Sequence, residues 1–198
     1  MKIGLVSLGC PKNLVDSEVM LGLAQKAGHE LTNDAAGADV LVVNTCAFIN
    51  SAKQESIDTI LEMAQHKKDG ACRRLIVTGC LAERYRDELR AEIPEIDAVL
   101  GTGEVPEIVQ AIGGAAMPHG ASRLMFHRVA PHGQPTAQPS ATSPQPPSYI
   151  YDANTPRLLA TPKHYAYVKI AEGCCAATTG AAQPIRSSAR RVRSRSAA

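Results

Sequence analysis

Short runs of apolar residues alternate along the first part of this chain with longer segments in which apolar residues recur every three or four positions. The runs are typical of strands covered on both faces, and the periodic segments are typical of helices with one buried face. The predicted strands span residues 3–6, 30–32, 39–44, 75–78 and 98–100. The predicted helices span residues 14–27, 51–67, 81–93 and 104–112. This alternation predicts an α/β fold, a parallel sheet of about five strands with helices on both faces.

The first predicted helix has candidate signals at both of its ends. Asn13 is expected to cap its N-terminus, and Asp16 stands in the reciprocal position of a capping box. Gly28 suits the C-terminal end, because glycine readily adopts the left-handed conformation that closes many helices. Asn13 and Asp16 are therefore interpreted as local signals of a helix start.

The pattern changes after residue 112, and the change predicts the domain organisation. Residues 1–112 are expected to form one domain. Residues 113–150, with six prolines between Pro131 and Pro147, predict a Pro-rich linker. Structure is expected to resume in residues 151–174, with a strand within 161–170. Residues 175–198 are rich in Ala, Arg and Ser and predict a disordered tail.

The charge is unevenly distributed along the chain. The net charge is +2, but residues 175–198 contain five Arg and no acid, which leaves residues 1–174 with a net charge of −3. We therefore expect no nucleic-acid partner for the body of the protein. No apolar run approaches the roughly 20 residues of a membrane span, and the first run is too short for a secretion signal. These features predict a cytoplasmic protein with no membrane partner.

Three of the six cysteines occupy equivalent positions. Cys10, Cys46 and Cys80 each lie shortly after a predicted strand, 36 and 34 residues apart. If the strands are parallel, the three thiols meet at one edge of the sheet, where such folds bind ligands. No histidine lies within ten residues of any of them. Thiolates alone suit an iron–sulfur cluster, so these cysteines are candidate cluster ligands.

Other interpretations of the cysteines remain open. Cysteine is often a small buried packing residue, and the domain could instead be a flavodoxin-like nucleotide-binding module with structural cysteines. Cys72 precedes its predicted strand and is expected to have no part in the site. Iron binding separates these alternatives.

Several longer motifs resemble one enzyme family. The segments SLGCPKNLVDSE, VVNTCAFI, VTGCLAERY and GTGEVPEIV resemble the N-terminal domain of the methylthiotransferases, at residues 7–18, 42–49, 77–85 and 101–109. These radical S-adenosylmethionine enzymes insert sulfur and a methyl group at an unactivated C–H bond. Gly-Cys-Pro-Lys-Asn is similar to the ribosomal-protein branch, RimO, whereas the tRNA branch, MiaB, more typically has Gly-Cys-Gln-Met-Asn. Residues 155–174 also resemble the start of the RimO radical domain.

The resemblance implies a cofactor set and a substrate. It implies that Cys10, Cys46 and Cys80 hold the auxiliary 4Fe-4S cluster, whose open iron takes part in sulfur delivery. A second 4Fe-4S cluster, which cleaves S-adenosylmethionine, needs a C-x-x-x-C-x-x-C triplet, and Cys174 stands where its first ligand belongs. The implied reaction of the family is methylthiolation of an aspartate in ribosomal protein S-twelve.

The sequence departs from the family pattern after Cys174. Cys175 follows directly, and no further cysteine occurs in the chain. We interpret the abrupt Ala, Arg and Ser composition as the mark of a truncated or frameshifted methylthiotransferase with an incomplete radical domain. This chain alone is then expected to be inactive. The alternative is a non-enzymatic iron–sulfur or partner-binding module left by the truncation.

Overall fold

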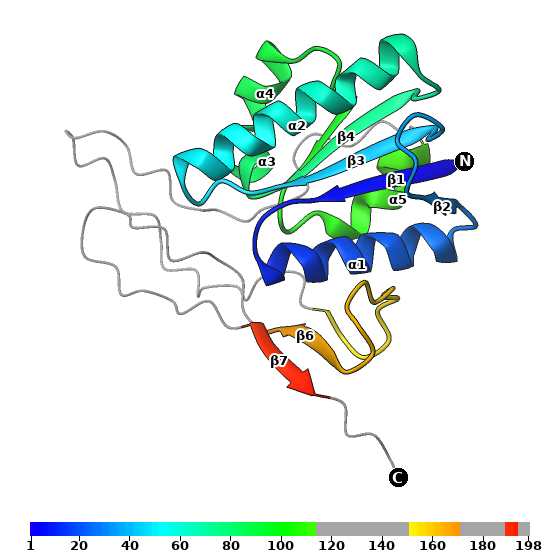
Figure 1. Cartoon of the computed structure of the whole chain (residues 1–198), viewed down its shortest axis with the longest axis vertical. Coiled ribbons are helices and arrows are strands. Elements are labelled where there is room, and N and C mark those ends of the chain that lie inside the picture. The colour runs from blue at the N-terminus through cyan, green and yellow to red at the C-terminus, as the bar shows by residue number, and fades with distance from the viewer. Residues whose placement is uncertain (114–150, 171–188, 194–198) are drawn as a thin grey trace, which may run out of the picture.

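The computed structural model describes residues 1–113, 151–170 and 189–193. Five parallel strands form one sheet in the order β2-β1-β3-β4-β5 (Figure 1). They are β1 (Lys2–Ser7), β2 (Glu30–Thr32), β3 (Val40–Thr45), β4 (Arg74–Gly79) and β5 (Ala98–Leu100). The predicted parallel five-stranded sheet is confirmed, and each predicted strand lies within two residues of its observed bounds.

Helices cover both faces of the sheet, as predicted. Helices α2, α3 and α4 lie on one face, and α1 and α5 lie on the other (Figure 1). The helical elements are α1 (Pro11–Lys26), α2 (Asn50–Asp69), α3 (Cys80–Arg84), α4 (Arg86–Glu92), the 3-10 turn η1 (Val105–Glu107) and α5 (Ile108–Gly113).

The sheet separates two hydrophobic clusters, and β3 contributes to both. Leu41 and Val43 pack in the cluster beneath α2, with Ile60 of that helix. Val40 and Val42 pack in the opposite cluster, which contains residues of α1 and α5. Alternate residues of a strand point to opposite faces, so a strand covered on both sides is apolar throughout. The continuous apolar run at β3 follows from this position.

Helix α1 begins three residues earlier than predicted. Cys10 is its N-cap residue and makes no capping bond through its side chain, while Pro11 takes the first helical position. Proline suits that position because its fixed φ matches the helix and its missing N–H is not needed there. The prediction that Asn13 and Asp16 form a capping box is therefore wrong. Gly28 has a φ of 85° after the C-terminal turn, as predicted.

Two other helices also differ in detail from the prediction. The helix predicted at residues 81–93 is divided into α3 and α4 at Tyr85, whose φ of −127° is not helical. The last predicted helix begins as the 3-10 turn η1, with Pro106 within it. These differences leave the order of the elements unchanged.

The segment 151–170 lies against the outer side of α1 and contains β6 (Tyr165–Lys169) (Figure 1). Strand β6 pairs antiparallel with β7 (Ala189–Arg193), with Tyr165 opposite Arg193. Strand β7 falls in the tail for which the sequence predicted disorder, so its pairing was not anticipated. Nearly all of the predicted linker, and Cys174 with Cys175, lie outside the described residues.

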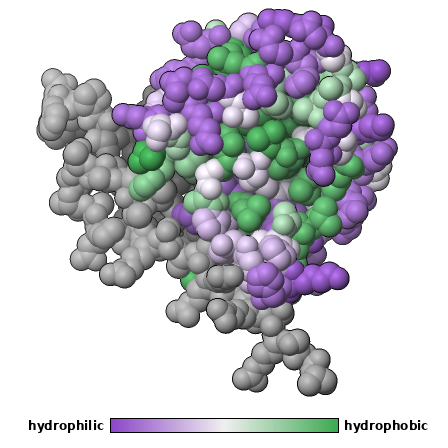
Figure 2. Space-filling view, viewed as in Figure 1, coloured by the Kyte–Doolittle hydropathy of each residue, from purple (hydrophilic) through white to green (hydrophobic). Residues whose placement is uncertain are grey.

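The surface is mostly hydrophilic over the helices that cover the sheet. Figure 2 shows hydrophilic residues over α2 and α4, and a hydrophobic band across the middle of the same face, where the sheet lies. Across the described ranges, no helix is both long enough and apolar enough to span a membrane.

Candidate metal centre

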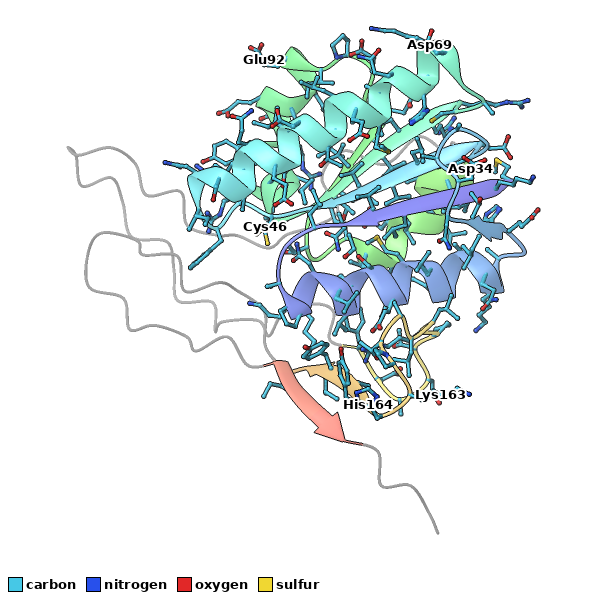
Figure 3. All side chains as sticks on the ribbon, viewed as in Figure 1. Asp34, Cys46, Asp69, Glu92, Lys163 and His164 are labelled. Carbon is cyan, nitrogen blue, oxygen red and sulfur yellow. The ribbon has the colours of Figure 1, made fainter. Side chains whose placement is uncertain are left out.

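The three candidate cysteines follow three neighbouring strands. Cys10 comes after β1, Cys46 after β3 and Cys80 after β4, and β3 lies between the other two. Because the strands are parallel, their carboxyl ends lie at one edge, where Figure 3 shows Cys46. The strand order reverses between β1 and β3, and such switch points are the usual ligand sites of doubly wound sheets.

Two glycines bring the outer turns against the end of β3. Gly9 and Gly79 each precede a candidate cysteine and have φ values of 92° and 95°. A Cβ atom on Gly9 would lie 2.7 Å from Cys46 Cβ, and one on Gly79 would lie 2.5 Å from Thr45 O. Contacts this short exclude any side chain at either position. The turns that carry Cys10 and Cys80 are therefore packed directly against residues 45–46.

The main chain of Cys46 is fixed by a serine of α2. Ser56 Oγ accepts a hydrogen bond from Cys46 N over 3.1 Å and donates one to Cys46 O over 2.9 Å. Ser56 is fully buried, so both polar groups of Cys46 are satisfied away from water. Arg84 Nη1 also donates to the next carbonyl, Ala47 O, over 3.1 Å. These contacts hold the cysteine-bearing end of β3 in one conformation.

A buried asparagine connects the three turns. Asn13 Nδ2 donates to Leu8 O over 3.0 Å and to Thr45 O over 2.8 Å. The Cys80 thiol donates to Asn13 Oδ1 over 3.8 Å, a long contact of the kind that a weak S–H donor makes. Asn44 Nδ2 in turn donates to the main-chain oxygen of Asn13 over 2.8 Å.

Cys72 lies away from this edge. It precedes β4, whereas Cys80 follows it, and six residues of strand separate the two by about 20 Å. Its thiol donates to Arg74 O over 3.2 Å, and burial raises its pKa above the ordinary value for cysteine. Cys72 is therefore a packing residue with a poorly ionised thiol, and it cannot join the other three.

The chemistry of the donor set can be compared with possible metals. In the part of the chain that the structure describes, no three His, Cys, Asp or Glu side chains are grouped around the position of a single ion. A cubane cluster differs from a single ion because each thiolate binds a different iron, so its ligands need not meet at one point. Cys10 and Cys80 are half-buried, and Cys46 is 8% exposed. This donor set fits an iron–sulfur cluster, and the ligand assignment stays a prediction.

Comparison with known proteins agrees with the motifs. A family model described as "Uncharacterized protein family UPF0004" matches residues 2–101, which contain all three candidate cysteines. Relatives named "Ribosomal protein uS12 methylthiotransferase RimO" include one from Solibacter usitatus (strain Ellin6076), 53% identical over 88% of this chain and 32% of that protein. A second, from Pelotomaculum thermopropionicum, is 53% identical over 88% of this chain and 35% of its own length. A third, from Koribacter versatilis (strain Ellin345), is 50% identical over 87% of this chain and 39% of its own length.

The present chain is much shorter than these relatives, of which it spans about a third in length. The family model nevertheless covers half of the chain and every strand that carries a candidate ligand. The chain therefore belongs to protein family UPF0004, and the resemblance to the RimO-type methylthiotransferases that its motifs predicted is confirmed.

Proposed function

We propose that residues 1–112 are the cluster-binding domain of a RimO-type methylthiotransferase, with Cys10, Cys46 and Cys80 as the ligands of its auxiliary 4Fe-4S cluster. The observation that carries this proposal is the packing of the Cys10 and Cys80 turns against the end of β3. This packing brings the three cysteine-bearing strand ends together at one edge of the sheet, as a shared cluster requires.

The protein's own residues have defined parts in this proposal. When bound, the cluster would supply an open iron that exchanges its non-protein ligand. The three cysteines would hold it, and Ser56 and the two glycines would fix their main chains. Cys10 is the N-cap of the 16-residue helix α1, whose positive dipole end favours an anionic group beside it.

The wider reaction is also part of the proposal. The relatives are named as methylthiotransferases of ribosomal protein uS12, and we propose the same substrate for the complete enzyme. Cys174 is proposed as the first ligand of the second 4Fe-4S cluster, the one that binds S-adenosylmethionine. We propose a cytoplasmic location, because cysteine thiols stay reduced in such a compartment. We also propose that these residues have no membrane or nucleic-acid partner.

Anaerobic reconstitution with iron and sulfide tests the cluster assignment. We expect about one cluster for each chain, measured as iron content and as visible absorption. Replacing Cys10, Cys46 or Cys80 by Ala should abolish loading. Cys72→Ala is the matched control, since it removes a thiol about 20 Å from Cys80, and it should load normally. Loss of the cluster in Cys72→Ala, or its retention in Cys46→Ala, would refute the ligand set.

A second candidate function is a non-enzymatic iron–sulfur or partner-binding module. It is favoured by one feature of the sequence: Thr178 and Ala181 stand where a C-x-x-x-C-x-x-C triplet that begins at Cys174 needs its other two cysteines. Both candidates predict loading at Cys10, Cys46 and Cys80. Neither predicts cleavage of S-adenosylmethionine by these 198 residues. The DNA sequence just after codon 174 separates the two, because only the enzymatic candidate predicts that a C-x-x-x-C-x-x-C triplet continues there in another reading frame.

A further inference from the structure

Asn13 is a buried amide whose side chain forms hydrogen bonds with the segments that carry the candidate ligands. Its two N–H bonds go to Leu8 O and Thr45 O, and its oxygen accepts from the Cys80 thiol. We propose that Asn13 is a positioning residue, which holds the turns of Cys10, Cys46 and Cys80 at the separation that one cluster needs. This proposal rests on the proposed function, because it concerns the same three cysteines.

The positions of the acceptors explain why this one amide can act on the whole site. Leu8 O lies two residues before Cys10, and Thr45 O lies directly before Cys46. The two carbonyls belong to different strand ends, 37 residues apart in the sequence. Asn13 is only 3% exposed, and its bond to Thr45 O is buried while that to Leu8 O is partly buried. Unpaired carbonyls at this depth are costly, and the two turns would be expected to separate.

A role in helix capping does not account for these contacts. The N-cap of α1 is Cys10, and Asn13 is the third residue of the helix, within its first turn. A capping side chain accepts a bond from the N–H groups of its own first turn, whereas Asn13 donates to carbonyls outside the helix. Its bonds therefore fix how α1 is placed against β1 and β3, and with it the position of Cys10.

Asn44 reinforces the same arrangement from β3. Its Nδ2 donates to Asn13 O over 2.8 Å and to Ser17 Oγ over 2.9 Å. Its Oδ1 is buried and has no hydrogen-bond partner among the described residues, and it faces the Cα atom of Gly79. Asn44 thus connects Asn13 to the turn that precedes Cys80. The two amides together contact all three turns.

The test compares Asn13→Ala with Met20→Ala as a matched control. Met20 is fully buried on the same helix, seven residues or about 10 Å further along, and packs in the core away from the cysteines. Both variants lose a buried side chain, but only Asn13→Ala loses the bonds to the turns. Each is measured as the apo chain by amide hydrogen exchange, and after reconstitution by the iron retained against a chelator.

We expect two specific effects in Asn13→Ala. The amides of Leu8 and Cys46, which donate to Asn44 O and Ser56 Oγ, should exchange faster than in the wild-type chain, while that of Ile76 in β4 should change little. The cluster should be held about 10- to 100-fold less tightly, as when a supporting partner of a metal ligand is removed. Met20→Ala should lower the melting temperature but should bind the cluster as the wild-type chain does. The exchange of its Leu8 and Cys46 amides, compared with that of the Ile76 amide, should match the wild-type chain.

Each contrary result has a distinct meaning. Normal loading and normal local exchange in Asn13→Ala would overturn the proposal. Faster exchange spread equally over the whole sheet would also overturn it, because that result marks a general loss of stability. If the wild-type chain itself takes up no cluster, the proposed function fails, and the exchange data alone then decide whether Asn13 holds the turns.

Discussion

Gly79 is the residue of the candidate site at which a side chain has least room. Its φ of 95° with a ψ of −158° lies in a region that is open almost only to glycine. The space beside its Cα is taken by the Asn44 amide oxygen and the Thr45 carbonyl. Conformation and packing therefore both require glycine before Cys80, and the same holds for Gly9 before Cys10.

The variant Gly79→Ala measures these two requirements together. We expect it to lower the free energy of unfolding by about 3 kcal/mol, from strain at a conformation closed to alanine and from contact with β3. Gly28→Ala is the matched control, because Gly28 has a φ of 85° with nothing within 4 Å of the added carbon. Gly28→Ala should lower the free energy of unfolding by only about 1 kcal/mol. Urea denaturation gives both values, and equal losses would show that packing against β3 contributes nothing.

At the scale of residues, the candidate ligands could be predicted from the sequence, but the residues whose hydrogen bonds hold the ligand turns could not. The cysteines were found because each follows an apolar run, which is a local pattern. Asn13 was assigned to a helix cap because asparagine before an apolar periodic segment is typical of one. Pro11 moves the helix start to residue 11 and carries Asn13 into the first turn, where its partners come from β1 and β3. Contacts between distant segments leave no such local signal.

Helix α1 is the element that links the sheet to the segment 151–170. Its inner side packs on the sheet, and its outer side carries two buried acids that bond to that segment. Lys169 Nζ lies 2.6 Å from Asp16 Oδ1, and Arg157 Nε lies 2.8 Å from Glu18 Oε2. Burial raises the pKa of Asp16, although the nearby Lys169 ammonium acts in the opposite direction. A helix covered on both sides explains why acids that look like surface residues in the sequence are buried.

The ion pair between Glu18 and Arg157 is expected to hold segment 151–170 in place. Glu18 Oε1 also accepts from Ala160 N over 2.7 Å, and Gly22 leaves room for the main chain of Arg157. Glu18→Gln keeps the shape of the side chain but puts an amide N–H group or a neutral oxygen next to the Arg157 guanidinium. We expect the segment to dock more weakly by roughly 2 kcal/mol, a reduced value because the Arg157 side chain stays 22% exposed.

Hydrogen exchange at Leu158 and Ala160 measures this docking directly. Their N–H groups donate to Glu18 O and Glu18 Oε1, so the exchange of Ala160 in particular should be faster in Glu18→Gln. Glu62→Gln, at an exposed position of α2, is the control for the loss of one negative charge. Unchanged exchange at Ala160 would show that the apolar contacts of the segment suffice without the ion pair.

At the scale of the whole molecule, the fold is what brings three distant cysteines to one edge. Strands β1, β3 and β4 are each followed by a helix, and parallel pairing puts the carboxyl ends of these strands at the same edge of the sheet. The parallel sheet and the shared edge could be predicted from the sequence, because short apolar runs alternate with segments of helical periodicity. The docking of residues 151–170 on α1, and the pairing of β6 with β7, depend on contacts between segments far apart in the chain. Their charged residues gave no periodic pattern from which these contacts could be predicted.

The last prediction concerns the reaction that these 198 residues can support. Reductive cleavage of S-adenosylmethionine by the family needs three cysteines in a C-x-x-x-C-x-x-C triplet, and here only Cys174 and Cys175 are available at that place. Adjacent residues cannot occupy positions that the triplet spaces three and four residues apart. We therefore expect no 5′-deoxyadenosine from a polypeptide of these residues, even after its first cluster is loaded. The reconstituted chain is incubated with S-adenosylmethionine and dithionite, and the products are separated by chromatography. Formation of 5′-deoxyadenosine above the level of a Cys174→Ala control would show that the incomplete triplet suffices, and would favour the enzymatic candidate over the binding module.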